Sequence, residues 1–166
     1  QVKTTVDKAD GDNPNFFEIL TAAAICHFAN QAVDVAVFET GLGGRLDATN
    51  VLTPLVCGIT QVSLDHTDIL GKDLASIARE KGGIFKKNVP AISCEQAPEA
   101  AAALRDVAEK AGTPLHFTGE DIEFSYRFEA NRELGPHTRV CLSTDDRNYE
   151  HLPVPLRGEH QALNCG

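Results

Sequence analysis

The spacing of apolar residues along the chain predicts three helices. Phe17, Leu20, Ala24 and Phe28 follow one another at three or four residues, which is the period of a helix with one buried face. A second helix would follow a capping aspartate, and an alanine-rich third would end at a glycine. The predicted helices span residues 16–30, 73–82 and 98–111.

Continuous apolar runs lie between these helices and predict strands. Strands that are covered on both faces lack the polar alternation of surface strands, as in a parallel sheet. The predicted strands of this kind are residues 33–38, 55–62, 90–93 and 115–117. Because strand and helix alternate, we expect an α/β domain with a mostly parallel sheet and flanking helices.

Residues 120–150 follow a different pattern. Polar and apolar residues alternate over Ile122–Phe128 and again over Thr138–Ser143, and Gly135 and Pro136 interrupt the chain between the two runs. This alternation predicts an antiparallel hairpin. We expect the hairpin to be attached to the parallel sheet.

Composition and charge narrow the class of protein. The 166 residues fit one domain, which we place at 16–166 after a polar loop or linker at 1–15. A net charge of −9 argues against a nucleic-acid or membrane partner, because such surfaces are rich in Lys and Arg. No apolar run approaches the ~18 residues of a membrane span, and no signal peptide is visible. Five cysteines without a C-x-x-C pair indicate free thiols and a cytoplasmic protein.

Polar side chains follow two of the predicted strands. Glu39 comes directly after Phe38, and Asp65 and His66 follow the strand that ends at Val62. Open α/β sheets bind ligands outside the carboxyl ends of their strands. A carboxylate and an imidazole could hold a divalent cation there together with water and phosphate oxygens. The alternatives are a glycine-rich turn with a solvated Glu39 and a histidine with a structural role only.

Neither common phosphate-binding motif is present. A G-x-G-x-x-G motif would need glycine where the sequence has Leu46, and a P-loop would need Ser or Thr where Asp73 follows Gly71-Lys72. The glycines after Glu39 therefore do not identify a nucleotide site by themselves.

Lys81 departs from the pattern of its helix. Leu74, Ile77 and Ala78 form the apolar stripe, and Lys81 takes the next position of that stripe. Burying an ammonium group is costly unless the group is paired or neutral. Lys81 could reach solvent from the helix end or pair with a nearby carboxylate. Alternatively, a lysine of lowered pKa could take up carbon dioxide as a carbamate and become an oxygen ligand for a metal.

Several segments together resemble folylpolyglutamate synthases and bifunctional dihydrofolate synthases of the Mur-ligase superfamily. They are Phe16–Ala22, Glu39–Asn50, Leu64–Gly71, Ile77–Ile84 and, at the start of the family's adenine-side helix, Leu156–Asn164. The resemblance implies a central ATP-binding domain of the P-loop NTPase-like type. It also implies that the family's P-loop lies upstream of Gln1 and its glutamate-binding domain after Gly166.

The same resemblance implies a reaction and a site. Such enzymes use ATP to phosphorylate a substrate carboxylate, and an amino group then displaces the phosphate, here to join L-glutamate to dihydropteroate or folates. The implied residues are Glu39 and His66 as magnesium ligands, Lys81 as a carbamylated catalytic lysine, Leu46, Asp47 and Ala48 on the pterin side, and His160, Gln161 and Asn164 at the adenine.

Three other interpretations remain at this point. A Mur-type ligase could act on a peptidoglycan precursor, or the chain could be a non-catalytic nucleotide-binding module. A metal-dependent hydrolase using Glu39, His66 and a carbamylated lysine is disfavoured because no H-x-H pair occurs. Without the P-loop, we expect the chain alone to bind ATP weakly and to catalyse little.

Overall fold

A computed structural model describes residues 13–155, 161–162 and 165 of the chain. The chain divides into two compact units, Gln1–Thr53 and Pro54–Gly166. The predicted loop at 1–15 lies almost entirely outside the described residues. No helix in the described part is long and apolar enough to cross a membrane.

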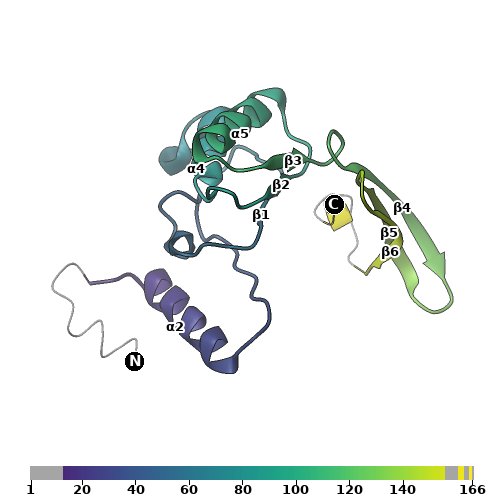
Figure 1. The fold of residues 1–166 in the computed structure, drawn as a ribbon, viewed down its shortest axis with the longest axis horizontal. Helices are drawn as coiled ribbons and strands as arrows, with labels where there is room; N and C mark the ends of the chain where they lie inside the picture. Colours follow the sequence, from purple (N-terminus) through teal and green to yellow (C-terminus); the bar gives the residue numbers. More distant parts are fainter. Residues whose placement is uncertain (1–12, 156–160, 163–164, 166) are drawn as a thin grey trace. The chain divides into compact units, whose positions relative to one another are not determined.

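The first unit contains the helix α2 (Phe16–Gln31), which is labelled in Figure 1, and the short 3-10 helix η1 (Ala48–Val51). A reciprocal capping box begins α2, in which the Glu18 amide donates to the Asn15 side chain at 2.9 Å and the Asn15 amide donates to the Glu18 carboxylate at 2.8 Å. The helix ends at Ala32, which adopts the left-handed conformation with φ 50°. The helix predicted at 16–30 is confirmed.

Residues 33–38 do not form the predicted strand. The side chains of Val33, Val35 and Val37 are exposed by 44%, 68% and 89%, and the segment pairs with no other segment in the described part of the chain. Apolar content favours a strand only where a neighbouring strand supplies the hydrogen-bond ladder and the covering surface. The predicted strand was therefore wrong. Within the described residues, no neighbouring strand pairs with this segment or covers its side chains.

In the second unit, three short strands form a parallel sheet. The strands are β1 (Cys57–Ile59), β2 (Ala91–Ser93) and β3 (Leu115–Phe117), in the order β1-β2-β3. Cys57 pairs with Ala91, and Ala91 pairs with Leu115. The predictions for residues 90–93 and 115–117 are confirmed, whereas the strand predicted at 55–62 is shorter because only its centre pairs with β2.

The helices of this unit are α3 (Thr67–Leu70), α4 (Leu74–Gly82) and α5 (Pro98–Ala111), and α4 packs against α5. A Cβ atom at Gly82 would lie 3.2 Å from Val107 Cγ1 and 3.3 Å from Leu104 Cδ2. Gly82 therefore does more than end α4, since its missing side chain lets the last turn approach α5 closely. The two longer helices are confirmed, and α3 was not predicted.

The strands β4 (Glu123–Asn131), β5 (Gly135–Ser143) and β6 (Asn148–Val154) form a separate antiparallel sheet. The predicted hairpin is confirmed, but its attachment to the parallel sheet and its turn were wrong. The Asn131 side chain accepts hydrogen bonds from the Glu133 and Leu134 amides at 3.0 and 2.7 Å, so an Asn turn at 131–134 reverses the chain. The missed third strand contains Pro153, a residue that sheets accept at their edges.

Candidate functional site

Asp47 organises the segment that carries Glu39, which we call the glycine-rich loop (residues 39–50). One carboxylate oxygen accepts hydrogen bonds from the amides of Gly41 at 2.8 Å and Leu42 at 2.9 Å. The other accepts from the amide of Thr49 at 2.9 Å and from its hydroxyl at 2.6 Å. One side chain thus ties both ends of the loop together.

The same contacts perturb the Asp47 carboxyl group. Partial burial would raise its pKa, but the hydrogen bonds from the Thr49 hydroxyl and from the amides of Leu42, Thr49 and Gly41 act in the opposite direction. The net effect is a pKa below the usual value, because these donors favour the charged form. Asp47 is therefore an ionised brace of the loop, a structural role that its prediction as a pterin-side residue did not include.

Gly41 joins the glycine-rich loop to α2. A Cβ atom at this position would lie 2.6 Å from Cζ of Phe17, which is closer than a real side chain could approach. The Phe28 ring of the same helix meets Phe38 edge-on, with centroids 5.6 Å apart. Glu39 is exposed and lies between these two points of attachment along the chain.

The other residues of the predicted pterin-side segment flank Asp47. Leu46 is 80% exposed, and Ala48 begins η1. An apolar side chain held at the surface of a braced loop can contact a ligand.

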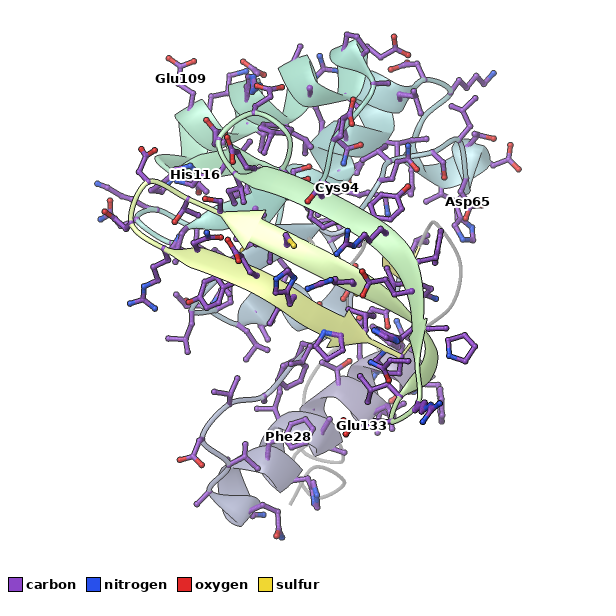
Figure 2. All side chains as sticks on the ribbon, turned by 90° about the vertical axis from the view of Figure 1, so that its right-hand side faces the viewer. Phe28, Asp65, Cys94, Glu109, His116 and Glu133 are labelled. Atoms are coloured by element: carbon purple, nitrogen blue, oxygen red, sulfur yellow. The ribbon has the colours of Figure 1, made fainter. Side chains whose placement is uncertain are left out.

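In the second unit, Asp65 and His66 follow β1 in a segment that we call the His66 loop (residues 60–66). The His66 amide donates to Asp65 Oδ1 at 2.7 Å, and Nε2 of His66 lies 3.7 Å from Asp65 Oδ2. The two side chains are 57% and 75% exposed, and Asp65 is labelled in Figure 2. The imidazole and the carboxylate are therefore close together and open to a ligand.

His66 has a left-handed backbone conformation, with φ 48° and ψ 39°. This conformation costs a residue other than glycine roughly 1–2 kcal/mol. The His66 carbonyl accepts from the amides of Ile69 and Leu70 at 2.9 Å, so the first turn of α3 holds the residue in place. Local strain of this kind is common where a side chain must be aimed.

Lys81 lies in the last turn of α4 and is half-buried. In the described part of the chain, its ammonium group takes part in none of the ion pairs, so the pairing with a nearby carboxylate that the sequence allowed is not observed. A cation at a helix C-terminus is favourable because the helix dipole is negative there. The position therefore tolerates an ordinary ammonium group.

The predicted metal ligands belong to different units, Glu39 to the first and His66 to the second. The described residues contain no cluster of three or more His, Cys, Asp or Glu side chains that could hold a metal ion. Asp65 and His66 by themselves form a pair of donors. An oxygen and an imidazole nitrogen suit a divalent cation that keeps water or phosphate oxygens as its remaining ligands.

Of the predicted adenine-side residues, only Gln161 can be placed. It is helical and half-buried, and the following Ala162 is fully buried. His160 and Asn164 lie outside the described residues.

Sequence reasoning missed Gln96, which lies between β2 and α5. Its side-chain amide donates to the Thr60 carbonyl at 2.9 Å and to Ser93 Oγ at 3.0 Å, and its carbonyl oxygen accepts from the Val62 amide at 2.8 Å. Gln96 therefore connects the end of β2 with the start of the His66 loop. A single glutamine in a loop gives no pattern from which this role could have been predicted.

Comparison with known proteins shows which family the chain resembles. No protein-family model matches the chain. The chain is 43% identical over 152 residues to the dihydrofolate synthase/folylpolyglutamate synthase of Escherichia coli, and 38% identical over 161 residues to that of Bacillus subtilis. These matches cover 91% and 96% of this chain but 33% and 36% of the two relatives. The chain thus spans about a third of their length.

Solved structures give the same result. A mutant folylpolyglutamate synthase of L. casei superposes with a TM-score of 0.85, at 31% identity, over 98% of this chain and 39% of that chain. A folylpolyglutamate synthase complex with AMPPCP and folate superposes with a TM-score of 0.82, at 31% identity, over 98% of this chain and 38% of that chain. Sequence and fold agree along nearly the whole chain, which therefore belongs to the family of folylpolyglutamate and dihydrofolate synthases as a part of such a protein.

Proposed function

We propose that the chain is the central nucleotide-handling part of an ATP-dependent ligase that joins L-glutamate to a pteroate or folate carboxylate. One observation carries the proposal, namely the match over 98% of the chain to a folylpolyglutamate synthase bound to AMPPCP and folate. AMPPCP is an analogue of ATP. The proposed small-molecule partners are therefore ATP, L-glutamate, and dihydropteroate or folates.

The proposed reaction has two displacements. A substrate carboxylate oxygen attacks the γ-phosphoryl group of ATP and releases ADP, which leaves an acyl phosphate. The amino group of glutamate then attacks the acyl carbon, so that a C–N bond forms, the C–O bond to phosphate breaks and inorganic phosphate leaves. Phosphoryl transfer depends on alignment and charge neutralisation rather than on a nucleophilic side chain, so this chain needs to supply ligands and positioning.

Mg²⁺ bound at such a site would neutralise phosphate charge and orient the triphosphate. Glu39 and His66 would hold it, and the donor chemistry fits because both side chains are exposed and offer oxygen or imidazole nitrogen. Lys81 would contribute through a carbamate, which replaces a positive charge with two oxygen atoms at the end of α4. Its half-buried position and its lack of an ion partner within the described residues support this role.

The finer assignments remain part of the proposal. The glycine-rich loop, with Leu46, Asp47 and Ala48, would face the pterin, and the segment with His160, Gln161 and Asn164 would contact adenine. The five free cysteines support a reducing, cytoplasmic location. No observation on this chain favours a peptidoglycan-precursor ligase, because the relatives and structures described above are folate-branch enzymes.

The test is ligation by the complete protein that contains this chain. Wild type should add glutamate to dihydropteroate or to a folate only when ATP is present, with the product identified by mass spectrometry. Lys81→Ala should reduce the rate by about tenfold to a hundredfold, because loss of the carbamate oxygens would loosen the Mg²⁺ that neutralises the phosphate charge. A short carboxylic acid should restore part of the activity by replacing the carbamate oxygens.

Lys110→Ala is the matched control. Lys110 is an exposed lysine of α5 that pairs with Asp106 at 2.7 Å, so its loss should leave ligation unchanged. Full activity of Lys81→Ala would refute the role of Lys81. No ligation by wild type with either acceptor would refute the proposed function as a whole.

A further inference from the structure

The start of the His66 loop is held by a side chain from another part of the sequence. The last backbone hydrogen bond between the ends of β1 and β2 runs from the Cys94 amide to the Ile59 carbonyl at 3.1 Å. Beyond Ile59 the side-chain amide of Gln96 takes over, with its nitrogen 2.9 Å from the Thr60 carbonyl oxygen and its oxygen 2.8 Å from the Val62 amide. The Gln96 amide thus acts like one more peptide unit of β2.

Both ends of the Gln96 amide are engaged, which fixes its orientation. A glutamine amide offers one oxygen and one NH₂ group, and here the NH₂ group also donates to Ser93 Oγ at 3.0 Å. Ser93 is fully buried, and its hydroxyl donates to the Cys94 carbonyl at 2.9 Å. The clamp is therefore anchored in the packed end of β2.

This clamp limits where the exposed side chains of the His66 loop can go. Val62 is 5% exposed and marks the end of the held segment. On the far side of the loop, α3 holds the His66 carbonyl through the Ile69 and Leu70 amides. Only residues 63–65 lie between the two anchors, so the position of Val62 strongly constrains the direction in which His66 points.

We propose that Gln96 is a positioning residue for the cation site of the proposed ligase, which it serves by fixing Thr60 and Val62 and thereby aiming Asp65 and His66. The inference rests on the proposed function, since it takes His66 as a ligand of the nucleotide-bound cation. Gln96 does not touch the cation or the substrate in this arrangement. Its effect passes through the backbone of the His66 loop.

Thr113 offers a matched control at the opposite end of the same sheet. Its hydroxyl donates to the Lys86 carbonyl at 2.8 Å, which ties the segment before β3 to the segment before β2. Thr113→Val and Gln96→Leu each remove a side-chain tie between neighbouring loops with little change in volume. Only Gln96→Leu removes it at the carboxyl ends of the strands, where the His66 loop begins.

The experiment measures Mn²⁺ binding, in the presence of AMPPCP, to the complete protein by electron paramagnetic resonance. Gln96→Leu should weaken Mn²⁺ binding by about tenfold, as is typical when a group supporting a metal ligand is lost. Thr113→Val should bind Mn²⁺ like wild type, although both variants should lower the melting temperature by a few degrees. Equal Mn²⁺ affinities in the two variants would reduce Gln96 to an ordinary structural residue and overturn the proposal.

A second, milder variant tests the proposal even if Gln96→Leu does not fold. Gln96→Glu keeps an oxygen for the Val62 amide but loses the donor to the Thr60 carbonyl. It should weaken Mn²⁺ binding about threefold and speed hydrogen exchange at the amides of residues 62–66. Hydrogen exchange in α5 should be unaffected. Unchanged exchange and Mn²⁺ affinity in this variant would also overturn the proposal. Failure of wild type to bind Mn²⁺ with AMPPCP would instead overturn the proposed function, so the two failures are distinguishable.

Discussion

The glycine-rich loop and the His66 loop carry the two predicted metal ligands and are held in different ways. In the glycine-rich loop, Asp47 receives hydrogen bonds from Gly41, Leu42 and Thr49, which are two to six residues away in sequence. In the His66 loop, Gln96 binds Val62 and Thr60 across 34 and 36 residues. The first loop is braced by its own sequence, whereas the second depends on the pairing of β1 with β2. The first brace is also charged and the second is neutral, so the loops should respond differently to mutation and pH.

The largest expected effect is the loss of the charged brace. Asp47→Ala removes four hydrogen bonds to a carboxylate, and bonds to charged groups contribute about 1.5–3 kcal/mol each at most. Because the loop is partly exposed and can rehydrate, we expect a net local destabilisation of about 2–3 kcal/mol. Hydrogen exchange should speed up at the amides of Gly41, Leu42 and Thr49 and stay unchanged in the His66 loop.

Asp34→Ala serves as the control, since Asp34 is an exposed aspartate of the same unit. If Asp47→Ala also released the His66 loop, the two loops would not be independently braced and the comparison would fail.

An intermediate effect is expected at the contact between Gly41 and Phe17. Gly41→Ala forces the aromatic ring away from its 2.6 Å approach, but the half-exposed ring can swing, so we expect a cost of about 1 kcal/mol. The paired substitution Gly41→Ala with Phe17→Ala should cost less than the sum of the two single changes, since the clash needs both side chains. Chemical denaturation of the four proteins measures this coupling, and strict additivity would show that α2 does not support the glycine-rich loop.

The smallest expected effect is a pH dependence confined to the first loop. The Asp47 pKa is lower in the folded protein than in the unfolded chain, so its stabilising contribution is complete above the unfolded value of about 3.9 and is lost as pH falls through the folded pKa. The stability difference between wild type and Asp47→Asn should therefore shrink on acidification below about pH 4.

The neutral Gln96 amide has no such titration, so the difference between wild type and Gln96→Leu should stay constant over the same range. A constant difference for Asp47→Asn as well would show that the Asp47 carboxylate does not brace the loop as an ion.

Local signals explain which parts of the fold could be predicted. The helix α5 was predicted with its bounds from its alanine-rich run and from Gly112, which adopts the left-handed conformation, with φ 69°, that ends a helix. Asp73 was predicted as the cap of α4, and the Ser76 amide donates to it at 2.7 Å. These features act within a few residues, so a single sequence displays them.

Features that depend on a partner could not be predicted in the same way. The apolar runs at 33–38 and 55–62 look alike in sequence, yet only the second contains a paired strand. The strand β6 was missed because polar and apolar residues alternate only weakly along it. Its pairing with β5, rather than the strand propensity of its residues, makes it a strand. The clamp by Gln96 was also missed, since its partners are more than 30 residues away.

The sequence by itself determined the three longer helices, the aspartate cap of α4, the glycine end of α5, and the family resemblance carried by the segments around Glu39, His66 and Lys81. The tertiary structure decided which apolar runs became strands, that the hairpin joined β6 in a sheet of its own, and that Gln96 holds the His66 loop. The physical reason is the range of the interactions. Caps and turns form between near neighbours, whereas a ladder or a clamp forms only after distant segments have been brought together.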